Sequence, residues 1–229
     1  MTFQLPLGLQ LRGPTSLDDF VFGDDAPLLE LLQQQLAPQG EPLIYLHGES
    51  ASGRTHLLLG QCSAAQQLDL QVAYLPARQA AELAPQMLEG LEQLDLVAVD
   101  DADMLAGQLE WETALFNLFN RARDAGCRLL VSASQAAPQL AFLLPDLRSR
   151  LSWGITYRLG PLDDMQRRQL LQNLAQRRGL QMPDEVARYL VERHPRDTHS
   201  LQRLIERLDH DSLAEQRRLS IPFVRTRLD

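Results

Sequence analysis

The stretch of sequence that decides the fold is residues 48–55, which read GESASGRT. A short apolar run precedes it at residues 43–46, and a segment with helical character follows it over residues 55–67. A glycine- and serine-rich turn between a strand and a helix is the context that the phosphate-loop pattern G-x-x-x-x-G-K-[ST] requires. Glycines let the backbone curl so that its N–H groups face phosphate oxygens, and the dipole of the following helix adds to the attraction. The sequence therefore predicts an anion-binding loop.

This loop departs from the pattern at one position, because Arg54 stands where the pattern has lysine. Arginine keeps the positive charge, but its guanidinium is bulkier and forked, so it would position phosphate differently. Thr55 is expected to hold a magnesium ion through its hydroxyl. A turn that binds nothing is the alternative interpretation of the spacing alone. We expect phosphate binding, and Arg54 argues against efficient hydrolysis.

Apolar runs predict five strands, at residues 43–46, 72–75, 96–99, 129–131 and 155–159. Segments long enough for helices lie between them, and residues 110–124 place apolar side chains at helical spacing. Strands that alternate with helices are typical of a parallel sheet buried on both faces. Ligands of such sheets bind beyond the carboxyl ends of the strands. We therefore predict an α/β fold with its site at that edge.

Two acidic residues, Asp100 and Asp101, follow the third predicted strand. A phosphate loop needs a second carboxylate for magnesium, and Asp100 is the candidate to hold the water shell of the metal. Asp101 is a candidate to orient an attacking water. The alternative for these acids is a helix N-cap, a position where aspartate is favoured, and for Asp101 the two interpretations are compatible.

The pattern changes after Leu159, where Gly160 and Pro161 interrupt the chain. Residues 161–229 predict a small helical bundle. Its first helix is capped by an aspartate at 163 or 164 and ends near Gly179. A second helix begins at residues 183–185, a third contains the apolar stripe of residues 201–208, and a short last helix begins at residues 220–222.

Composition limits the class of protein. The chain has 229 residues and only two cysteines, which excludes a disulfide framework and indicates a cytoplasmic protein. We find no apolar stretch long enough for a transmembrane helix and no secretory signal at the start, so no membrane contact is expected. All 22 basic residues are arginine, against 30 acidic residues, so lysine chemistry is excluded. Residues 1–160 hold 9 arginines against 19 acidic residues, which argues against non-specific DNA binding by that part.

Together these motifs resemble the DnaA-related branch of the AAA+ ATPases, nearly end to end. Residues 20–23 (FVFG) resemble the segment that packs on adenine, and residues 147–154 (LRSRLSWG) resemble the box that carries the arginine finger. The resemblance implies that Arg150 is the finger and acts in trans, with Arg148 as the adjacent alternative. It implies a nucleotide site made of Phe20, Val21, Gly48, Ser50, Ala51, Ser52, Gly53, Arg54, Thr55, His56 and His199, with magnesium held at Thr55 and Asp100.

Within that branch the chain is similar to the regulatory inactivators of DnaA, the Hda family. No segment resembles the helix-turn-helix domain of DnaA itself, residues 216–223 resemble the C-terminal segment of the inactivators, and an arginine at the phosphate loop also occurs among them. Gln4, Leu5 and Leu7 resemble the motif that binds the replication sliding clamp. A glutamine and spaced leucines in a tail can anchor in an apolar pocket, and the alternative is a tail that is disordered or packed on the core.

The resemblance implies a division into a clamp-binding tail (residues 1–12), an AAA+ nucleotide-binding domain (13–160) and a helical lid (161–229). The strand-end segment of residues 131–134 (VSAS) carries serine, and His199 stands, at sensor positions where DnaA carries other residues. Neutral histidine supplies no fixed positive charge for a γ-phosphate, and an ordinary surface residue of the lid is the alternative for His199. ADP, or another nucleoside diphosphate, is therefore the expected ligand, and the chain's own ATPase activity is expected to be weak or absent.

The implied function is regulatory inactivation of DnaA. Bound to the sliding clamp (the β subunit of DNA polymerase III), the protein would promote hydrolysis of ATP on DnaA and so prevent re-initiation of replication. We also expect association with a second copy, for instance as a dimer, and no sequence-specific DNA binding. An autonomous AAA+ ATPase and an adaptor of DnaA that binds no nucleotide are the alternatives.

Overall fold

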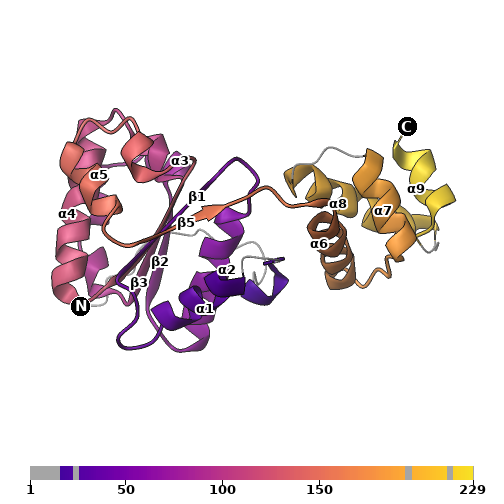
Figure 1. Cartoon of the computed structure of the whole chain (residues 1–229), viewed down its shortest axis with the longest axis horizontal. Helices are drawn as coiled ribbons and strands as arrows, with labels where there is room; N and C mark the ends of the chain where they lie inside the picture. The colour runs from indigo at the N-terminus through magenta and orange to yellow at the C-terminus, as the bar shows by residue number, and fades with distance from the viewer. Residues whose placement is uncertain (1–15, 23–25, 194–197, 216–218, 229) are drawn as a thin grey trace.

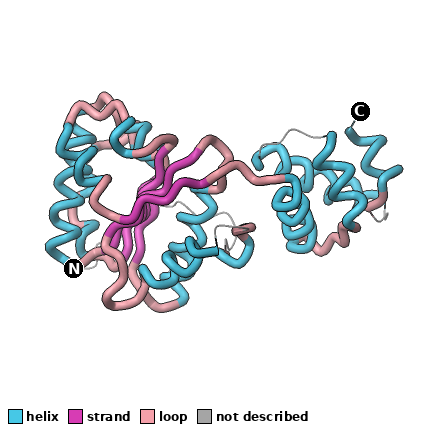
Figure 2. The backbone as a smooth tube through the Cα atoms, viewed as in Figure 1, coloured by secondary structure: helices cyan, strands magenta, loops and turns pink. Residues whose placement is uncertain are grey.

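The computed structural model describes residues 16–22, 26–193, 198–215 and 219–228. An α/β part extends to the end of the last strand at Leu159, and a group of helices follows from Asp164. One extended segment joins the two parts (Figures 1 and 2). Within the described residues no helix is both long and apolar enough to cross a membrane.

Five parallel strands form the central sheet, in the order β2-β3-β4-β1-β5. They are β1 (Leu43–Gly48), β2 (Val72–Pro76), β3 (Leu96–Asp100), β4 (Arg128–Ala133) and β5 (Ile155–Leu159). All five predicted strands are confirmed, and four of them extend by one to three residues. Because β4 lies between β1 and β3, the ends of these two strands sit two positions apart along the sheet.

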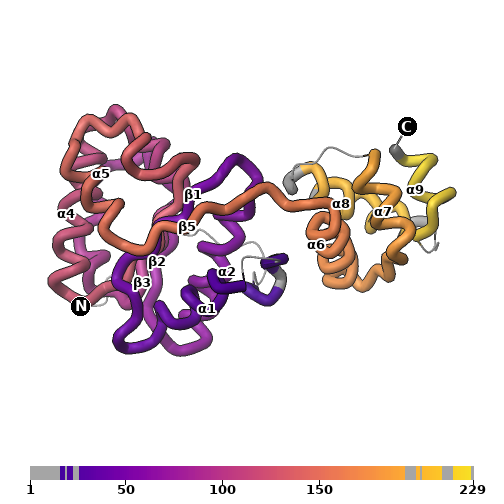
Figure 3. The backbone as a smooth tube through the Cα atoms, in the orientation of Figure 1, coloured from indigo at the N-terminus to yellow at the C-terminus, as the bar shows by residue number. Residues whose placement is uncertain are grey.

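Helices cover both faces of the sheet (Figures 1 and 3). One face carries α1 (Ala26–Gln35) and α2 (Arg54–Gln67), and the other carries α4 (Leu109–Ala125) and α5 (Pro145–Leu151) beside the short α3 (Ala77–Ala80). Short 3-10 turns complete the connections: η1 (Leu17–Asp19), η3 (Pro85–Leu88), η4 (Leu91–Gln93), η5 (Ala102–Leu105) and η6 (Ala137–Gln139). The structure thus shows the predicted α/β fold, a parallel sheet buried on both faces, here with one layer of helices on each side.

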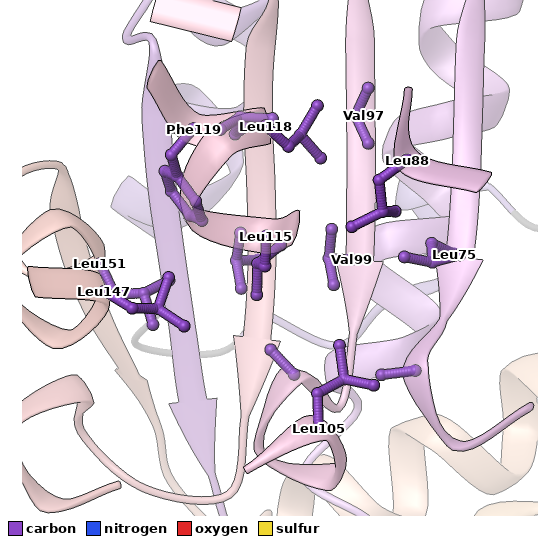
Figure 4. Packing of buried hydrophobic residues seen from close by; sticks show 14 of the residues in the cluster. Leu75, Leu88, Val97, Val99, Leu105, Leu115, Leu118, Phe119, Leu147 and Leu151 are labelled. Atoms are coloured by element: carbon purple, nitrogen blue, oxygen red, sulfur yellow. The ribbon is translucent and has the colours of Figure 1, made fainter. Parts of the chain in front are cut away.

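Alternating side chains of each strand explain why both faces need a cover. Val97 and Val99 of β3 point toward Leu115 and Leu118 of α4 (Figure 4), whereas Leu96 packs on the opposite layer with α1 and α2. A strand with apolar residues on both faces is stable only where helices exclude water from each side. The core therefore lies on both sides of the sheet, and the polar sites lie at its two edges.

A buried carboxylate fixes how α4 and α5 sit. Glu112, in the first turn of α4, is fully buried. It accepts the backbone N–H of Gly107 and the backbone N–H of Leu144, each at 2.8 Å. Buried charged acceptors with two donors are well satisfied, and removing one leaves those donors unpaired. Leu144 immediately precedes α5, so this carboxylate positions the start of that helix.

Among its described residues the second part has four helices: α6 (Asp164–Arg177), α7 (Asp184–Arg193), α8 (Thr198–Glu215) and α9 (Ile221–Leu228). Asp163 caps α6 through a reciprocal capping box with Gln166, with bonds of 2.7 and 2.8 Å. Gly179 has φ +73° just after the helix, a conformation that glycine adopts without strain. The predicted helical bundle is confirmed, and its apolar core includes Leu171, Val186, Leu190, Leu204, Leu208 and Val224.

Candidate functional site

The loop of residues 48–55 connects β1 to α2 at the carboxyl edge of the sheet. Gly48 packs so tightly that a Cβ atom there would lie 2.6 Å from the carbonyl oxygen of Leu159 on β5. Ala51 and Gly53 adopt left-handed backbone angles, with φ of +64° and +91°, and Gly53 is the N-cap of α2. Left-handed positions ahead of a helix N-terminus produce the curled backbone that binds anions.

Two buried donors of this loop have no hydrogen-bond partner among the described residues. They are the hydroxyl of Ser52, whose residue is 6% exposed, and Nη1 of Arg54. A buried polar atom without a partner costs about 1–3 kcal/mol, so native structures rarely keep one without a reason. An anion bound in the loop would satisfy both atoms, and the loop fits a phosphate group on this observation.

Asp100, at the end of β3, accepts three side-chain hydrogen bonds while only 4% exposed. Thr55 donates to Oδ2 at 2.7 Å and Tyr74 donates to the same oxygen at 2.8 Å. The hydroxyl of Ser132 on β4 donates to the other oxygen, Oδ1. The carboxylate is therefore fixed directly beside the phosphate loop.

This oxygen set suits magnesium, which is usually held by one or two carboxylates together with phosphate oxygens and water. The hydroxyl of Thr55 and the carboxylate of Asp100 are neighbours, as the sequence predicts, and the residue Thr55 is exposed to solvent. Tyr74 was not predicted. Its phenol approaches Asp100 only because β2 and β3 are neighbours in the sheet, and the burial and the negative charge of Asp100 raise the pKa of Tyr74 well above its usual range.

Asp101 forms an ion pair with Arg54, with 3.1 Å between Oδ1 and Nη2. The side chain of Arg54 is 11% exposed and that of Asp101 is 28% exposed. Asp101 occupies the N-cap position of η5, but its side chain makes no capping hydrogen bond, so the helix-cap alternative fails for that carboxylate. Burial and the neighbouring charge of Asp100 raise the pKa of Asp101, while Arg54 opposes the shift.

The segment before α1 lies against both the loop and the lid. The ring of Phe20 is so close to Gly53 that a Cβ there would lie 2.5 Å from a ring carbon, and its centroid is 6.0 Å from that of His56. Val21 instead packs on the apolar core of the lid helices. Of the two residues expected to contact adenine, Phe20 thus lies against the phosphate loop and Val21 against the lid.

His56 is held by the backbone rather than by another charged group. Its Nε2 lies 3.0 Å from the carbonyl oxygen of Ser16, and burial lowers the pKa of the ring. A neutral ring donates Nε2–H to that oxygen. His199 lies in α8, and its side chain is not among those that the structure describes. The predicted clamp-binding residues Gln4, Leu5 and Leu7 lie outside the described residues.

Arg150, near the end of α5, lies at the opposite edge of the sheet. Its guanidinium stacks on Trp153, with 3.9 Å from Cζ to the ring centroid, and lies 5.8 Å from the ring of Phe116. Trp153 is 61% exposed, so this stack faces solvent. Among the described residues neither Arg150 nor Arg148 has a recorded ion pair, which leaves both charges available.

A pocket of about 140 Å³ adjoins this stack. Its lining combines Arg150 and Trp153 with the residues where strands begin, namely Leu43, Leu129 and Gly154. Gly154 approaches the carbonyl oxygen of Leu43 so closely that no Cβ would fit. The six residues of β1 separate this amino edge from the phosphate loop by about 17 Å of strand. Arg150 therefore does not face the loop of its own chain.

Family models match nearly the whole described chain. The bacterial DnaA ATPase domain model matches residues 15–158, and the lid-domain model of Hda matches residues 164–228. Domain III of the replication initiation protein DnaA from Thermotoga maritima is a similar solved structure, with 22% identity and a TM-score of 0.78, and the alignment covers 92% of this chain and 93% of that one.

Two further solved structures share the fold. AMPPCP-bound DnaA from Aquifex aeolicus has 21% identity and a TM-score of 0.73, over 89% of this chain and 68% of that one. The RuvB Holliday junction branch migration motor of Thermotoga maritima has 17% identity and a TM-score of 0.70, over 93% and 70%. At these identities the likeness concerns the fold, and the family rests on the two models. The chain belongs to the DnaA-related AAA+ family and carries the lid domain of its Hda members.

Proposed function

We propose that this DnaA-related replication regulator inactivates DnaA by supplying an arginine finger to the ATP that DnaA holds. In this proposal the tail with Gln4, Leu5 and Leu7 binds the sliding clamp. The AAA+ core binds ADP and meets DnaA through the amino edge of its sheet. Hydrolysis on DnaA leaves DnaA–ADP and prevents a premature second round of initiation.

The placement of Arg150 is the single observation that carries this proposal. Its guanidinium stacks on an exposed tryptophan, at the edge of the sheet opposite its own phosphate loop. A cation in that place cannot serve the nucleotide of its own chain, but it can reach a nucleotide on a neighbouring molecule. The alternative, an arginine buried in an internal ion pair, does not describe this residue.

The chemistry asked of Arg150 is electrostatic. As the terminal phosphoryl group is transferred to water, negative charge spreads over its oxygens, and a guanidinium placed there stabilises the transition state. Such a finger accelerates hydrolysis by about 10³-fold or more. Stacking on Trp153 reduces the number of positions that Arg150 samples before the two proteins meet, which lowers the entropic cost of the contact.

The loop of this chain has a different task in the proposal. Its curled backbone, Ser52 and Arg54 bind the phosphates of ADP, and Thr55 with Asp100 would hold a magnesium ion that neutralises phosphate charge. Arg54 is already paired with Asp101, so we expect weak turnover of ATP by the chain itself. The bound nucleotide is then a structural ligand that supports the core and lid.

The test is a reconstituted assay of DnaA loaded with radiolabelled ATP, with clamp loaded on DNA and the purified protein. The readout is the fraction of DnaA-bound nucleotide converted to ADP over time. Arg150→Ala should lose about 10³-fold of the stimulation while clamp binding and ADP binding stay intact. Arg148→Ala is the matched control, because that arginine is two residues away on the same helix, and it should keep most of the stimulation.

Each alternative has its own outcome in the same assay. Full stimulation by Arg150→Ala would refute the finger assignment, and loss confined to Arg148→Ala would move the role to that residue. Clamp pull-down with Gln4→Ala and Leu5→Ala tests the tail. Magnesium-dependent turnover by the chain alone would indicate an autonomous ATPase, and absence of ADP binding at millimolar ligand would indicate an adaptor.

A further inference from the structure

The ion pair between Arg54 and Asp101 places a negative charge where the phosphate-loop cation should meet a ligand. In the phosphate-loop pattern, the residue at this position reaches the β- and γ-phosphates. Here the Nη2 atom of Arg54 is already 3.1 Å from a carboxylate oxygen of Asp101. The Nη1 atom is buried and without a partner in the described part of the chain, so the guanidinium keeps one unused donor for a further anion.

The position of Asp101 is fixed by the backbone rather than by chance side-chain contact. Its φ and ψ are 53° and 48°, a left-handed conformation that non-glycine residues rarely adopt. Its N–H donates to the hydroxyl of Ser132 at 2.9 Å, and that same hydroxyl donates to Asp100. Strained backbone persists only where the surroundings hold it, and it is concentrated at functional sites.

Asp101 lies among charges of both signs. Asp100 and Asp103 flank Asp101, and Arg78 is the further cation that acts on the same carboxylate. A triphosphate carries one more negative charge than a diphosphate and would place it beside Asp101. The loop N–H groups and the free Nη1 atom can serve a diphosphate without displacing that carboxylate.

We propose that Asp101 is a specificity-determining residue that occupies, on Arg54, the place of a γ-phosphate and so biases the loop toward nucleoside diphosphates. This inference rests on the proposed nucleotide binding and adds the residue that selects the ligand. A diphosphate binds next to the ion pair, whereas a triphosphate must compete with Asp101 for the guanidinium and bear the repulsion of its charge.

The test compares two dissociation constants by isothermal titration calorimetry in the presence of magnesium, with the full chain. The probes are ADP and AMPPCP, a triphosphate analogue that is not hydrolysed. Asp101→Asn removes the charge and keeps the shape and the left-handed backbone, which asparagine tolerates. The ratio of the AMPPCP to the ADP dissociation constant should fall about tenfold, because a like charge beside the guanidinium is gone.

Asp101→Gly gives a second variant in which the left-handed backbone is unstrained, so its fold is retained even if the asparagine variant is destabilised. The matched control is Asp103→Asn, since that carboxylate contacts Ser134 and not Arg54. It should leave the ratio within about twofold of the wild-type value. In an Arg54→Ala background, Asp101→Asn should change the ratio less than it does in the wild-type background, because the competition for the guanidinium is gone and only the direct repulsion by Asp101 remains.

The possible failures are distinguishable. If the wild-type chain binds both ligands and the ratio is unchanged in folded Asp101→Asn and Asp101→Gly, the inference is wrong and the proposed nucleotide binding stands. If the wild-type chain binds neither ligand, nucleotide binding itself is wrong and the inference falls with it. An equal shift in Asp103→Asn would show a diffuse charge effect and would also overturn the role of Asp101.

Discussion

The two edges of the sheet hold arginines in opposite environments. At the carboxyl edge Arg54 is largely buried, ion-paired with Asp101 and surrounded by the phosphate loop. At the amino edge Arg150 lies on an exposed tryptophan beside an open pocket. One cation is neutralised by its own chain, and the other has no recorded ion pair within the described residues.

The difference indicates which molecule each arginine can serve. A guanidinium that is desolvated and paired is preorganised for a ligand held by its own chain, at the cost of competing with its partner carboxylate. A guanidinium stacked on an aromatic surface keeps its charge and its solvent contact, as interface arginines do. If the edges are independent, a variant at one edge should leave the readout of the other unchanged.

The largest effect is expected from Asp100→Ala at the carboxyl edge. Thr55, Tyr74 and Ser132 would each lose their acceptor. Thr55 is exposed and can bond to water instead, whereas the hydroxyls of the half-buried Tyr74 and the buried Ser132 would stay unpaired, at a cost of about 1–3 kcal/mol each. We expect the free energy of unfolding to fall by about 3 kcal/mol or more, and the magnesium-dependent part of ADP affinity to disappear. Chemical denaturation and titration with and without EDTA measure the two effects.

The control for this variant is Asp124→Ala, which removes an exposed acid that pairs with its neighbour Arg123 at the end of α4. Exposed pairs of this kind contribute about 0–1 kcal/mol. Equal losses in the two variants would contradict the role given to the hydrogen-bond network of Asp100.

A smaller effect is expected from Gly53→Ala in the phosphate loop. The residue needs φ of +91°, and its Cβ would lie 2.5 Å from the ring of Phe20. Left-handed strain costs about 1–2 kcal/mol, and displacement of Phe20 alters the loop, so ADP affinity should fall about tenfold. Gly126→Ala is matched in backbone strain, with φ of +78°, but nothing lies within 4 Å of its Cβ.

Two measurements separate backbone strain from the contact with Phe20 in this pair of variants. In thermal denaturation both variants should have a lower melting temperature than the wild-type chain. In titration calorimetry only Gly53→Ala should bind ADP more weakly. An equal loss of ADP affinity in Gly126→Ala would show that the loop responds to global stability rather than to its own geometry.

The smallest effect is expected from Trp153→Ala at the amino edge. Exposed cation–π contacts contribute about 0.5–1 kcal/mol, so the stimulation of DnaA-bound ATP hydrolysis should fall about threefold to fivefold. Trp153→Phe should restore part of it, because a smaller aromatic face remains. ADP affinity should be unchanged in both variants, and a loss there would show that the two edges are coupled.

Much of the fold follows from local sequence. The strands are predicted because short apolar runs flanked by helical spacing have few other stable arrangements, and the lid helices because of signals such as Asp163 and Gly179. The phosphate loop is predicted from its glycine spacing together with the strand expected before it and the helix expected after it. These features depend on residues that are near one another in the chain.

The remainder depends on strand order and backbone conformation, which the chain does not encode locally. Tyr74 reaches Asp100 only because β2 pairs with β3, and Thr55 reaches it across β4. Arg54 pairs with Asp101 while the backbone of Asp101 is left-handed, a conformation that residue spacing does not predict. The stack of Arg150 on Trp153 depends on how α5 meets β5, although both residues belong to one short segment.

The buried carboxylate of Glu112 helps to set the orientation of Arg150, although the two residues belong to different helices. By accepting the N–H groups of Gly107 and Leu144, it ties the approach to α5 to the first turn of α4. We therefore expect a change at this interior position to shift the start of the helix that carries Arg150, without touching Arg150 itself. When related chains are compared, loss of the acid at position 112 is therefore a warning that the arginine proposed here as the finger is no longer held in the same orientation.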